Sequence, residues 1–169
     1  HVIRGEDHLN NTLRQLMVYE SLGAKPPIFG HVSLLVGEDR QKLSKRHGAT
    51  SVAQYREENY LPEALSNYLC LLGWSHPDEK DIFEMVEISK LFNLDRFSKS
   101  AALYDVEKLK WVNSQHLKNL DDKSIVELLS GVDHPIINKF KEEEDDWKVG
   151  FCSLFKEKVQ LTQELLPLI

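Results

Sequence analysis

HVIRGEDHLNNTLRQLMVYESLGAKPPIFGHVSLLVG, residues 1–37, changes its hydrophobic period twice. The opening residues favour the end of a strand, and apolar residues then recur at helical spacing: Leu13, Leu16 and Met17. Asn11 or Thr12 is suited to cap this helix, and Gly23 to end it. A β-rich segment follows and stops at Gly37. The order strand, helix, strand predicts a βαβ unit, the building block of a parallel sheet.

Parallel sheets bind ligands beyond the carboxyl ends of their strands, which here are followed by two loops. RGEDH follows the first strand, and GEDRQKLSKRHG follows the second. The second loop crowds cations together although the chain carries a formal net charge of −6. Its lysines suit a polyphosphate, with Leu43 as an anchor in the core and Ser44 as a hydroxyl donor. A solvated basic turn that binds nothing is the alternative interpretation of this loop.

From residue 51 onward the pattern predicts helices. Pro62 suits a first helical turn, and three polar residues suit N-caps: Ser51, Asp105 and Asp121. The stretch 147–169 predicts one longer helix with an apolar stripe of Phe151, Leu154, Phe155 and Val159. Tyr60, Trp74 and Trp111 have apolar neighbours and are predicted to pack in the core. RFSKS at 96–100 is assigned no chemistry, since no βαβ unit precedes it.

Composition excludes several classes of protein. Hydrophobic residues make up 41% and charged residues 28%, as in soluble globular domains. Cys70 and Cys152 lie far apart, and the seven histidines have no metal-ligand spacing, so we expect no zinc site and a reducing compartment. Because no apolar run has membrane length and no signal peptide is visible, we expect a cytoplasmic protein without membrane contact.

KLSKR, residues 42–46, resembles the Lys-Met-Ser-Lys-Ser signature of class I aminoacyl-tRNA synthetases. Three blocks resemble bacterial-type glutamyl-tRNA synthetases in the same order: HVIRGEDHLNNT, KLSKRHGATSVAQYREENYLPEALSNYLCLLGW and ALYDVEKLKWVN. The resemblance covers residues 1 to about 117. Leu43 stands where the signature has Met, a volume-conserving change, and Arg46 stands where it has the last Ser.

The resemblance implies a mainly α chain with a small α/β portion. Residues 1–50 would be the second half of a Rossmann-like nucleotide-binding domain of a class I synthetase. Residues 51–120 would form a helical stem-contact region, and residues 121–169 the start of an α-helical anticodon-binding region.

The resemblance also implies a reaction, in which ATP activates glutamate to glutamyl-adenylate and the glutamyl group passes to the 3′ end of tRNA(Glu). Lys42 and Lys45 would be catalytic, and Arg4 would hold the glutamate carboxylate as a bidentate partner. ATP, with Mg²⁺, would contact Asp7, His8, Leu34, Leu35 and Lys45. From the residues alone, Arg4 could instead pair with Glu6 or Asp7 at the surface.

The His-Ile-Gly-His element of this class is absent from the sequence, and the opening HVIRGED looks like the interior of a domain. We therefore expect a piece of a longer, monomeric ligase that does not aminoacylate tRNA by itself. The alternatives are a non-catalytic helical RNA-binding module and the sister glutaminyl-tRNA synthetase. A shortened paralogue that glutamylates a tRNA base is a further alternative, disfavoured by the helices after residue 120.

Overall fold

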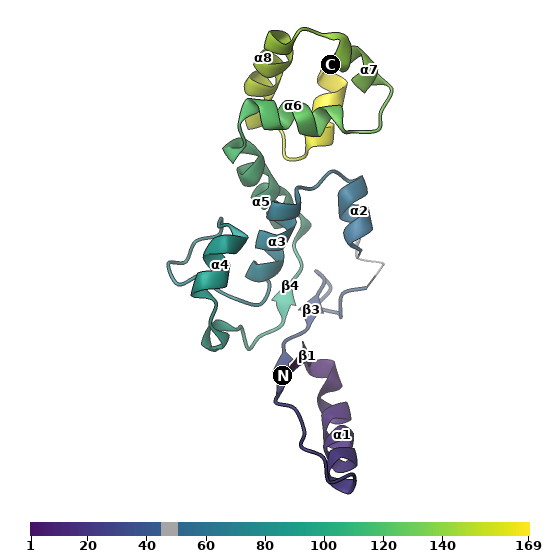
Figure 1. The fold of residues 1–169 in the computed structure, drawn as a ribbon, viewed down its shortest axis with the longest axis vertical. Helices are drawn as coiled ribbons and strands as arrows, with labels where there is room; N and C mark the ends of the chain where they lie inside the picture. Colours follow the sequence, from purple (N-terminus) through teal and green to yellow (C-terminus); the bar gives the residue numbers. More distant parts are fainter. Residues whose placement is uncertain (45–50) are drawn as a thin grey trace.

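The structure is a computed structural model that describes residues 1–44 and 51–169. Figure 1 shows an elongated molecule with a small α/β unit at one end, a group of helices in the middle and a second helical group at the other end. The expected mainly α chain with a small α/β portion is confirmed. Among the described residues, the strands form two separate two-stranded sheets.

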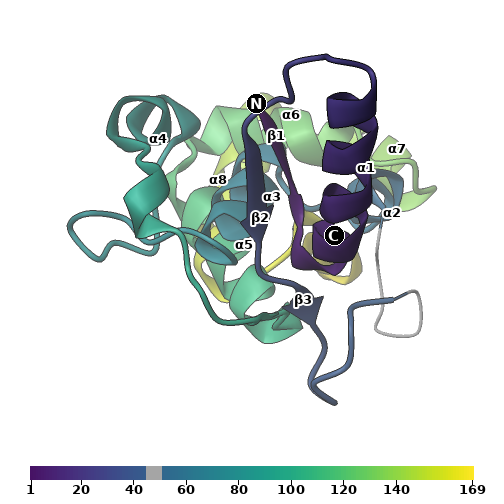
Figure 2. The same cartoon turned by 90° about the horizontal axis from the view of Figure 1, so that it is seen from below.

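The α/β unit consists of β1 (Val2–Gly5), α1 (Leu9–Ser21) and β2 (Phe29–Val32), with the short 3₁₀ turn η1 (Glu6–His8) between β1 and α1. β1 and β2 are parallel, with Arg4 opposite His31, so the predicted βαβ unit is confirmed. Figure 2 shows α1 lying alongside both strands. Gly23 adopts a φ of +63°, the left-handed conformation suited to a helix end.

The predicted cap of α1 is wrong. The helix begins at Leu9, so His8 is its N-cap residue and Thr12 lies one turn inside. Within α1, all of which is described, Thr12 is the one buried residue. Its hydroxyl donates to the carbonyl of His8 at 3.2 Å, as hydroxyls inside helices do, rather than capping a free N–H.

The predicted second β-rich segment is divided into β2 and β3 (Leu35–Val36), and β3 pairs in parallel with β4 (Ala102–Leu103). Sequence reasoning missed β4 because a two-residue strand has no period to detect. After β3 the chain turns back through Arg40, at φ 58°, and the Leu43 N–H donates to the Leu35 carbonyl at 2.9 Å. The start of the basic loop is therefore fixed to the strand that precedes it.

The middle region contains α2 (Val52–Glu57), α3 (Pro62–Leu71), α4 (Met85–Leu91), η3 (Leu94–Arg96) and α5 (Val106–Asn119). Its predicted helix starts are confirmed: Ser51 and Gln54 form a capping box, Pro62 opens α3, and Asp105 caps α5. α3 packs against α5 through buried apolar residues that include Ala64, Tyr68, Leu109 and Val112. Tyr60 and Trp74 are buried as predicted, but Trp111 is 40% exposed, so its assignment to the core is wrong.

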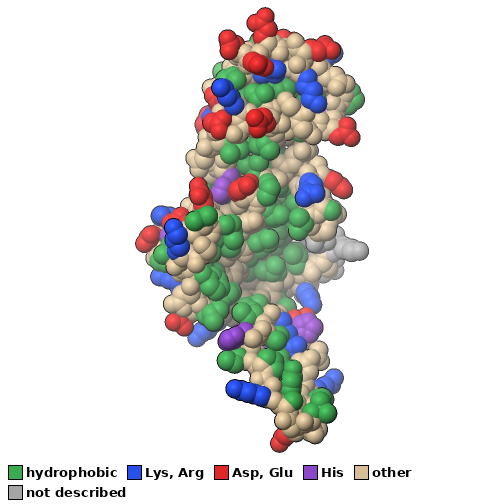
Figure 3. All heavy atoms as spheres, viewed as in Figure 1, with side chains coloured by type: hydrophobic (Ala, Val, Ile, Leu, Met, Phe, Trp, Pro, Cys, Tyr) green, Lys and Arg blue, Asp and Glu red, His purple; other side chains and the backbone are tan. Residues whose placement is uncertain are grey.

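The C-terminal group contains α6 (Asp122–Ser130), α7 (Ile136–Glu142), α8 (Asp145–Phe155), η4 (Lys156–Lys158) and η5 (Thr162–Leu168). Asp121 caps α6 as predicted. The single helix predicted over 147–169 is wrong, because α8 ends at Phe155 and Val159 is extended. Val159 and Leu165 are buried in the core that includes α6, whereas Leu154 is exposed. Burying these residues requires the chain to turn back. Figure 3 shows acidic side chains gathered over this end.

Candidate active site

The two loops that follow β1 and β3 meet in space. The Lys42 ammonium lies 2.6 Å from the Asp7 carboxylate in an ion pair between residues 35 positions apart. The hydrogen bond from Lys42 lowers the pKa of Asp7 below its ordinary value of 3.8, and burial opposes this shift. Asp7, predicted to contact ATP, and Lys42, predicted to be catalytic, come from separate loops and are therefore brought together.

Beside this ion pair lies an open hollow of about 580 Å³. Five residues predicted from the sequence line it: Leu34, Leu35, Lys42, Leu43 and Ser44. Lys45 and Arg46 of the same motif lie outside the described residues. A concave surface with apolar walls and a cation at its edge suits a base joined to a polyphosphate. Leu43 also packs against the main core together with Leu35, as its predicted role as an anchor requires.

The backbone N–H and carbonyl of Leu34 both form hydrogen bonds within the chain. The N–H of Leu34 donates to the Glu6 carboxylate at 3.3 Å, and its carbonyl accepts from the Ala102 N–H at 3.1 Å. Sequence reasoning did not single out Glu6, although it lies in the same RGEDH loop as Asp7. His8 is exposed, and its ring Nδ1 lies 3.4 Å from the Asn11 side-chain amide.

Arg4 does not pair with Glu6 or Asp7, the surface alternative. Its Nη2 donates to the Thr12 hydroxyl at 2.6 Å and to the Gln15 side-chain oxygen at 2.7 Å. Its guanidinium carbon lies 5.0 Å from the centre of the Phe29 ring, within the range of a cation–π contact. The Arg4 Nε is buried without a partner among the described residues.

Tyrosines of the helical region complete the wall of the hollow. Tyr55 and Tyr104 both line it, and their hydroxyls lie 2.6 Å apart. Burial raises the pKa of Tyr104, and the hydrogen bond with Tyr55 raises it further, so this hydroxyl stays protonated. Tyr68 accepts from the Asp105 N–H at 2.7 Å and donates to its carbonyl at 2.8 Å, and burial raises its pKa to about 12. Sequence reasoning did not single out Tyr55 and Tyr104 as site residues, because no local pattern shows that two hydroxyls 49 positions apart meet.

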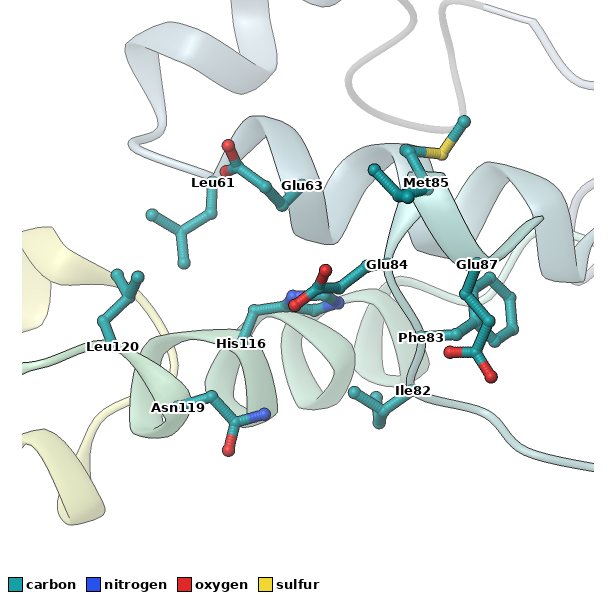
Figure 4. A pocket seen from close by; sticks show the side chains of 11 residues that line it. Leu61, Glu63, Ile82, Phe83, Glu84, Met85, Glu87, His116, Asn119 and Leu120 are labelled. Carbon is teal, nitrogen blue, oxygen red and sulfur yellow. The ribbon is translucent and has the colours of Figure 1, made fainter. Parts of the chain in front are cut away.

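A second hollow of about 550 Å³, shown in Figure 4, lies between α3, α5 and the start of α4. None of the residues predicted for the site lines it. Its carboxylates are explained by local structure, since Glu63 lies in the first turn of α3, Glu84 is the N-cap residue of α4 and Glu87 pairs with Lys80 at 2.9 Å. His116 lies 2.8 Å from the Asn67 side-chain oxygen, and burial lowers its pKa.

Residues 1–44 and 51–169 contain neither a metal-binding cluster nor a membrane-spanning helix. No group of three or more His, Cys, Asp or Glu residues in this part of the chain is placed to hold a metal ion. None of its helices combines the length and the apolar character that crossing a membrane requires.

The family model for tRNA synthetases class I (E and Q), catalytic domain, matches residues 1–111. The chain belongs to this family. The resemblance inferred from the three sequence blocks is thereby confirmed, and a non-catalytic RNA-binding module does not account for a match to a catalytic domain. A glutamate–tRNA ligase from Natranaerobius thermophilus is 47% identical over 170 residues, which are 99% of this chain and 35% of that protein. One from Carboxydothermus hydrogenoformans is 55% identical over 128 residues, 76% of this chain and 27% of that protein.

Part of a solved glutamate–tRNA ligase has the same fold as this chain. The crystal structure of a glutamate–tRNA ligase from Elizabethkingia meningosepticum, in complex with its amino acid, superposes with a TM-score of 0.87 at 33% identity. The superposition covers 99% of this chain and 36% of that one. The chain thus spans about a third of the length of the relatives that it matches.

Proposed function

We propose that the chain supplies part of the catalytic machinery of a glutamate–tRNA ligase. In this reaction ATP and glutamate form glutamyl-adenylate and pyrophosphate, and the glutamyl group then passes to the 3′ end of tRNA(Glu). The observation that carries the proposal is the Lys42–Asp7 ion pair beside a hollow lined by Leu34 and Leu35. It joins the two loops at the edge where parallel sheets bind their ligands.

The chemistry follows from charge. A glutamate carboxylate is already ionised and attacks the α-phosphate without a general base, so the protein must position the reactants and stabilise negative charge as pyrophosphate leaves. Lys42 serves this purpose with Lys45, which belongs to the proposal although it lies outside the described residues. The triphosphate carries more negative charge than the Asp7 carboxylate, so its binding draws Lys42 away from Asp7.

The nucleotide is proposed to lie with its adenine against Leu34 and Leu35 and its phosphates toward the two loops, near Asp7 and His8. Mg²⁺ enters with ATP as part of the substrate, and a carboxylate such as Asp7 is a ligand type that it prefers. Arg4 binds the glutamate carboxylate with Nε and Nη1, because Nη2 is engaged by Thr12 and Gln15.

The helical parts are proposed to contact the tRNA, with residues 51–120 on its stem and residues 121–169 leading toward the anticodon. Because the net charge is −6, such contacts depend on local lysines. A monomeric ligase in the cytoplasm belongs to the same proposal. The separate thiols of Cys70 and Cys152 suit a reducing compartment.

The test uses a ligase of the relatives' full length that carries this sequence. Lys42→Ala should lower kcat/KM for ATP by about 100-fold, the scale of losing one transition-state contact. Lys25→Ala, which removes an exposed lysine before β2, should leave it unchanged. Equal values of kcat/KM for the two variants would contradict the proposal.

The chain alone should not aminoacylate tRNA(Glu), and full transfer by it would contradict its role as one part of the machinery.

A further inference from the structure

Helix α1 packs on its sheet through a polar residue instead of an apolar stripe. A helix that packs on a sheet ordinarily buries apolar side chains against it. In α1 the buried residue is instead polar Thr12, while Leu13 and Met17 are 62% and 66% exposed. Thr12 and Gln15 are three residues apart and therefore lie on one face of the helix. Both side chains accept a hydrogen bond from the same nitrogen of Arg4.

The Thr12 hydroxyl connects three structural elements. It accepts from Arg4 of β1 at 2.6 Å, donates to the His8 carbonyl at 3.2 Å and lies 2.8 Å from Nε2 of His31 in β2. A hydroxyl has one proton and two lone pairs, so an imidazole with its proton on Nε2 fills the second lone pair. The proton and both lone pairs of this oxygen are then engaged in hydrogen bonds, which fixes its position.

The guanidinium of Arg4 is thereby held on two sides. The Phe29 ring covers its face at 5.0 Å, and Thr12 and Gln15 take both protons of Nη2. The buried Nε has no partner within the described residues. Leaving a buried charged donor unpaired is costly, which indicates that a ligand satisfies it.

We propose that Thr12 and Gln15 are positioning residues for substrate recognition. They fix the rotation of the Arg4 guanidinium so that Nε and Nη1 face the carboxylate of the amino-acid substrate, and His31 and Phe29 hold this arrangement from β2. This inference rests on the proposed function of Arg4. Thr12 and Gln15 act through Arg4. Their replacement should therefore change the kinetic constants for glutamate and not those for ATP.

The experiment measures aminoacylation by the full-length ligase while glutamate and ATP are varied separately. Thr12→Val keeps the shape of the side chain and removes the hydroxyl, and Gln15→Met removes the acceptor. Each should lower kcat/KM for glutamate by about tenfold, the effect of one hydrogen bond to a charged group. The KM for ATP should not change. Thr12→Ser, which restores the hydroxyl, should remain within about twofold of the unmodified enzyme. Asn10→Ala on the same helix is the control.

Arg4→Lys separates this inference from the proposed function. If Arg4→Lys lowers kcat/KM for glutamate but Thr12→Val and Gln15→Met do not, the positioning role is overturned and the role of Arg4 stands. If Arg4→Lys has no effect, both are overturned. In the double variant Arg4→Lys with Thr12→Val, the threonine change should add nothing, since its effect passes through the guanidinium. Equal losses for glutamate and ATP would indicate a structural role only and overturn the inference. Should Thr12→Val fail to fold, exposed Gln15 decides the outcome.

Discussion

Helices α1 and α6 carry similar patterns but are buried to very different extents. In α6, Ile125 and Leu129 are four residues apart and completely buried, because α8 and η5 pack on that stripe. In α1, Leu13 and Met17 have the same spacing and are mostly exposed, and the buried position is polar. The α6 end therefore depends on hydrophobic packing, whereas α1 meets its sheet through hydrogen bonds that converge on the candidate site.

The largest expected effect tests this contrast directly. Leu129→Ala should lower the free energy of unfolding of the chain by about 2–5 kcal/mol, because it leaves a cavity in a closed core. Leu13→Ala, the matched change on α1, should alter it by less than about 0.5 kcal/mol, because the side chain is largely in solvent already. Urea unfolding of both variants measures the difference, and equal losses would show that the two helices are stabilised alike.

The next effect concerns the connection between the middle and the C-terminal group. Asn113 is buried, accepts from the Leu61 N–H at 2.8 Å and donates to the Gln160 carbonyl at 2.6 Å. Asn113→Ala should cost about 2–3 kcal/mol of unfolding free energy, because two buried backbone groups lose their partner. Asn119→Ala, an exposed residue on the same helix, is the control for urea unfolding. A loss no larger than that of the control would mean that water replaces the amide.

The smallest effect concerns the exposed ion pair of the α/β unit. Because Lys42 lowers the pKa of Asp7 below 3.8, the stabilisation from this pair is complete above the unfolded pKa and is lost as the pH falls through the folded value. Lys42→Ala should therefore raise the pKa of Asp7, measured by the NMR shift of its carboxyl carbon, with little change in unfolding at neutral pH. An unchanged Asp7 titration would show that the two side chains do not pair in solution.

Local signals in the sequence predicted the parts of the fold that depend on local chemistry. The βαβ order, the Ser51, Asp105 and Asp121 caps and the opening of α3 at Pro62 depend on neighbouring residues, and all are confirmed. Two predictions that depended on distant partners were wrong: the burial of Trp111 and the single helix over 147–169. The end of α8 at Phe155 follows from the burial of Val159 in a core that no local pattern shows.

In the candidate site, too, the sequence predicted which residues take part but not the contacts that depend on the fold. The family blocks predicted that Asp7, Leu34, Leu35 and Lys42 belong to one site, and the fold pairs Asp7 with Lys42 beside a hollow lined by Leu34, Leu35 and Lys42. The local sequence predicts Asn11 or Thr12 as the helix cap, because both residue types are preferred at N-cap positions. The contacts of Thr12 with Arg4 and His31 join residues 8 and 19 positions away and depend on the strand register, which the sequence alone does not specify.

The most direct test is a crystal structure of the full-length ligase with a non-hydrolysable ATP analogue. The account predicts the adenine against Leu34 and Leu35, with the Lys42 ammonium moved from Asp7 to within hydrogen-bond distance of a phosphate oxygen. A triphosphate bound elsewhere, with the Lys42–Asp7 ion pair intact at 2.6 Å, would contradict it.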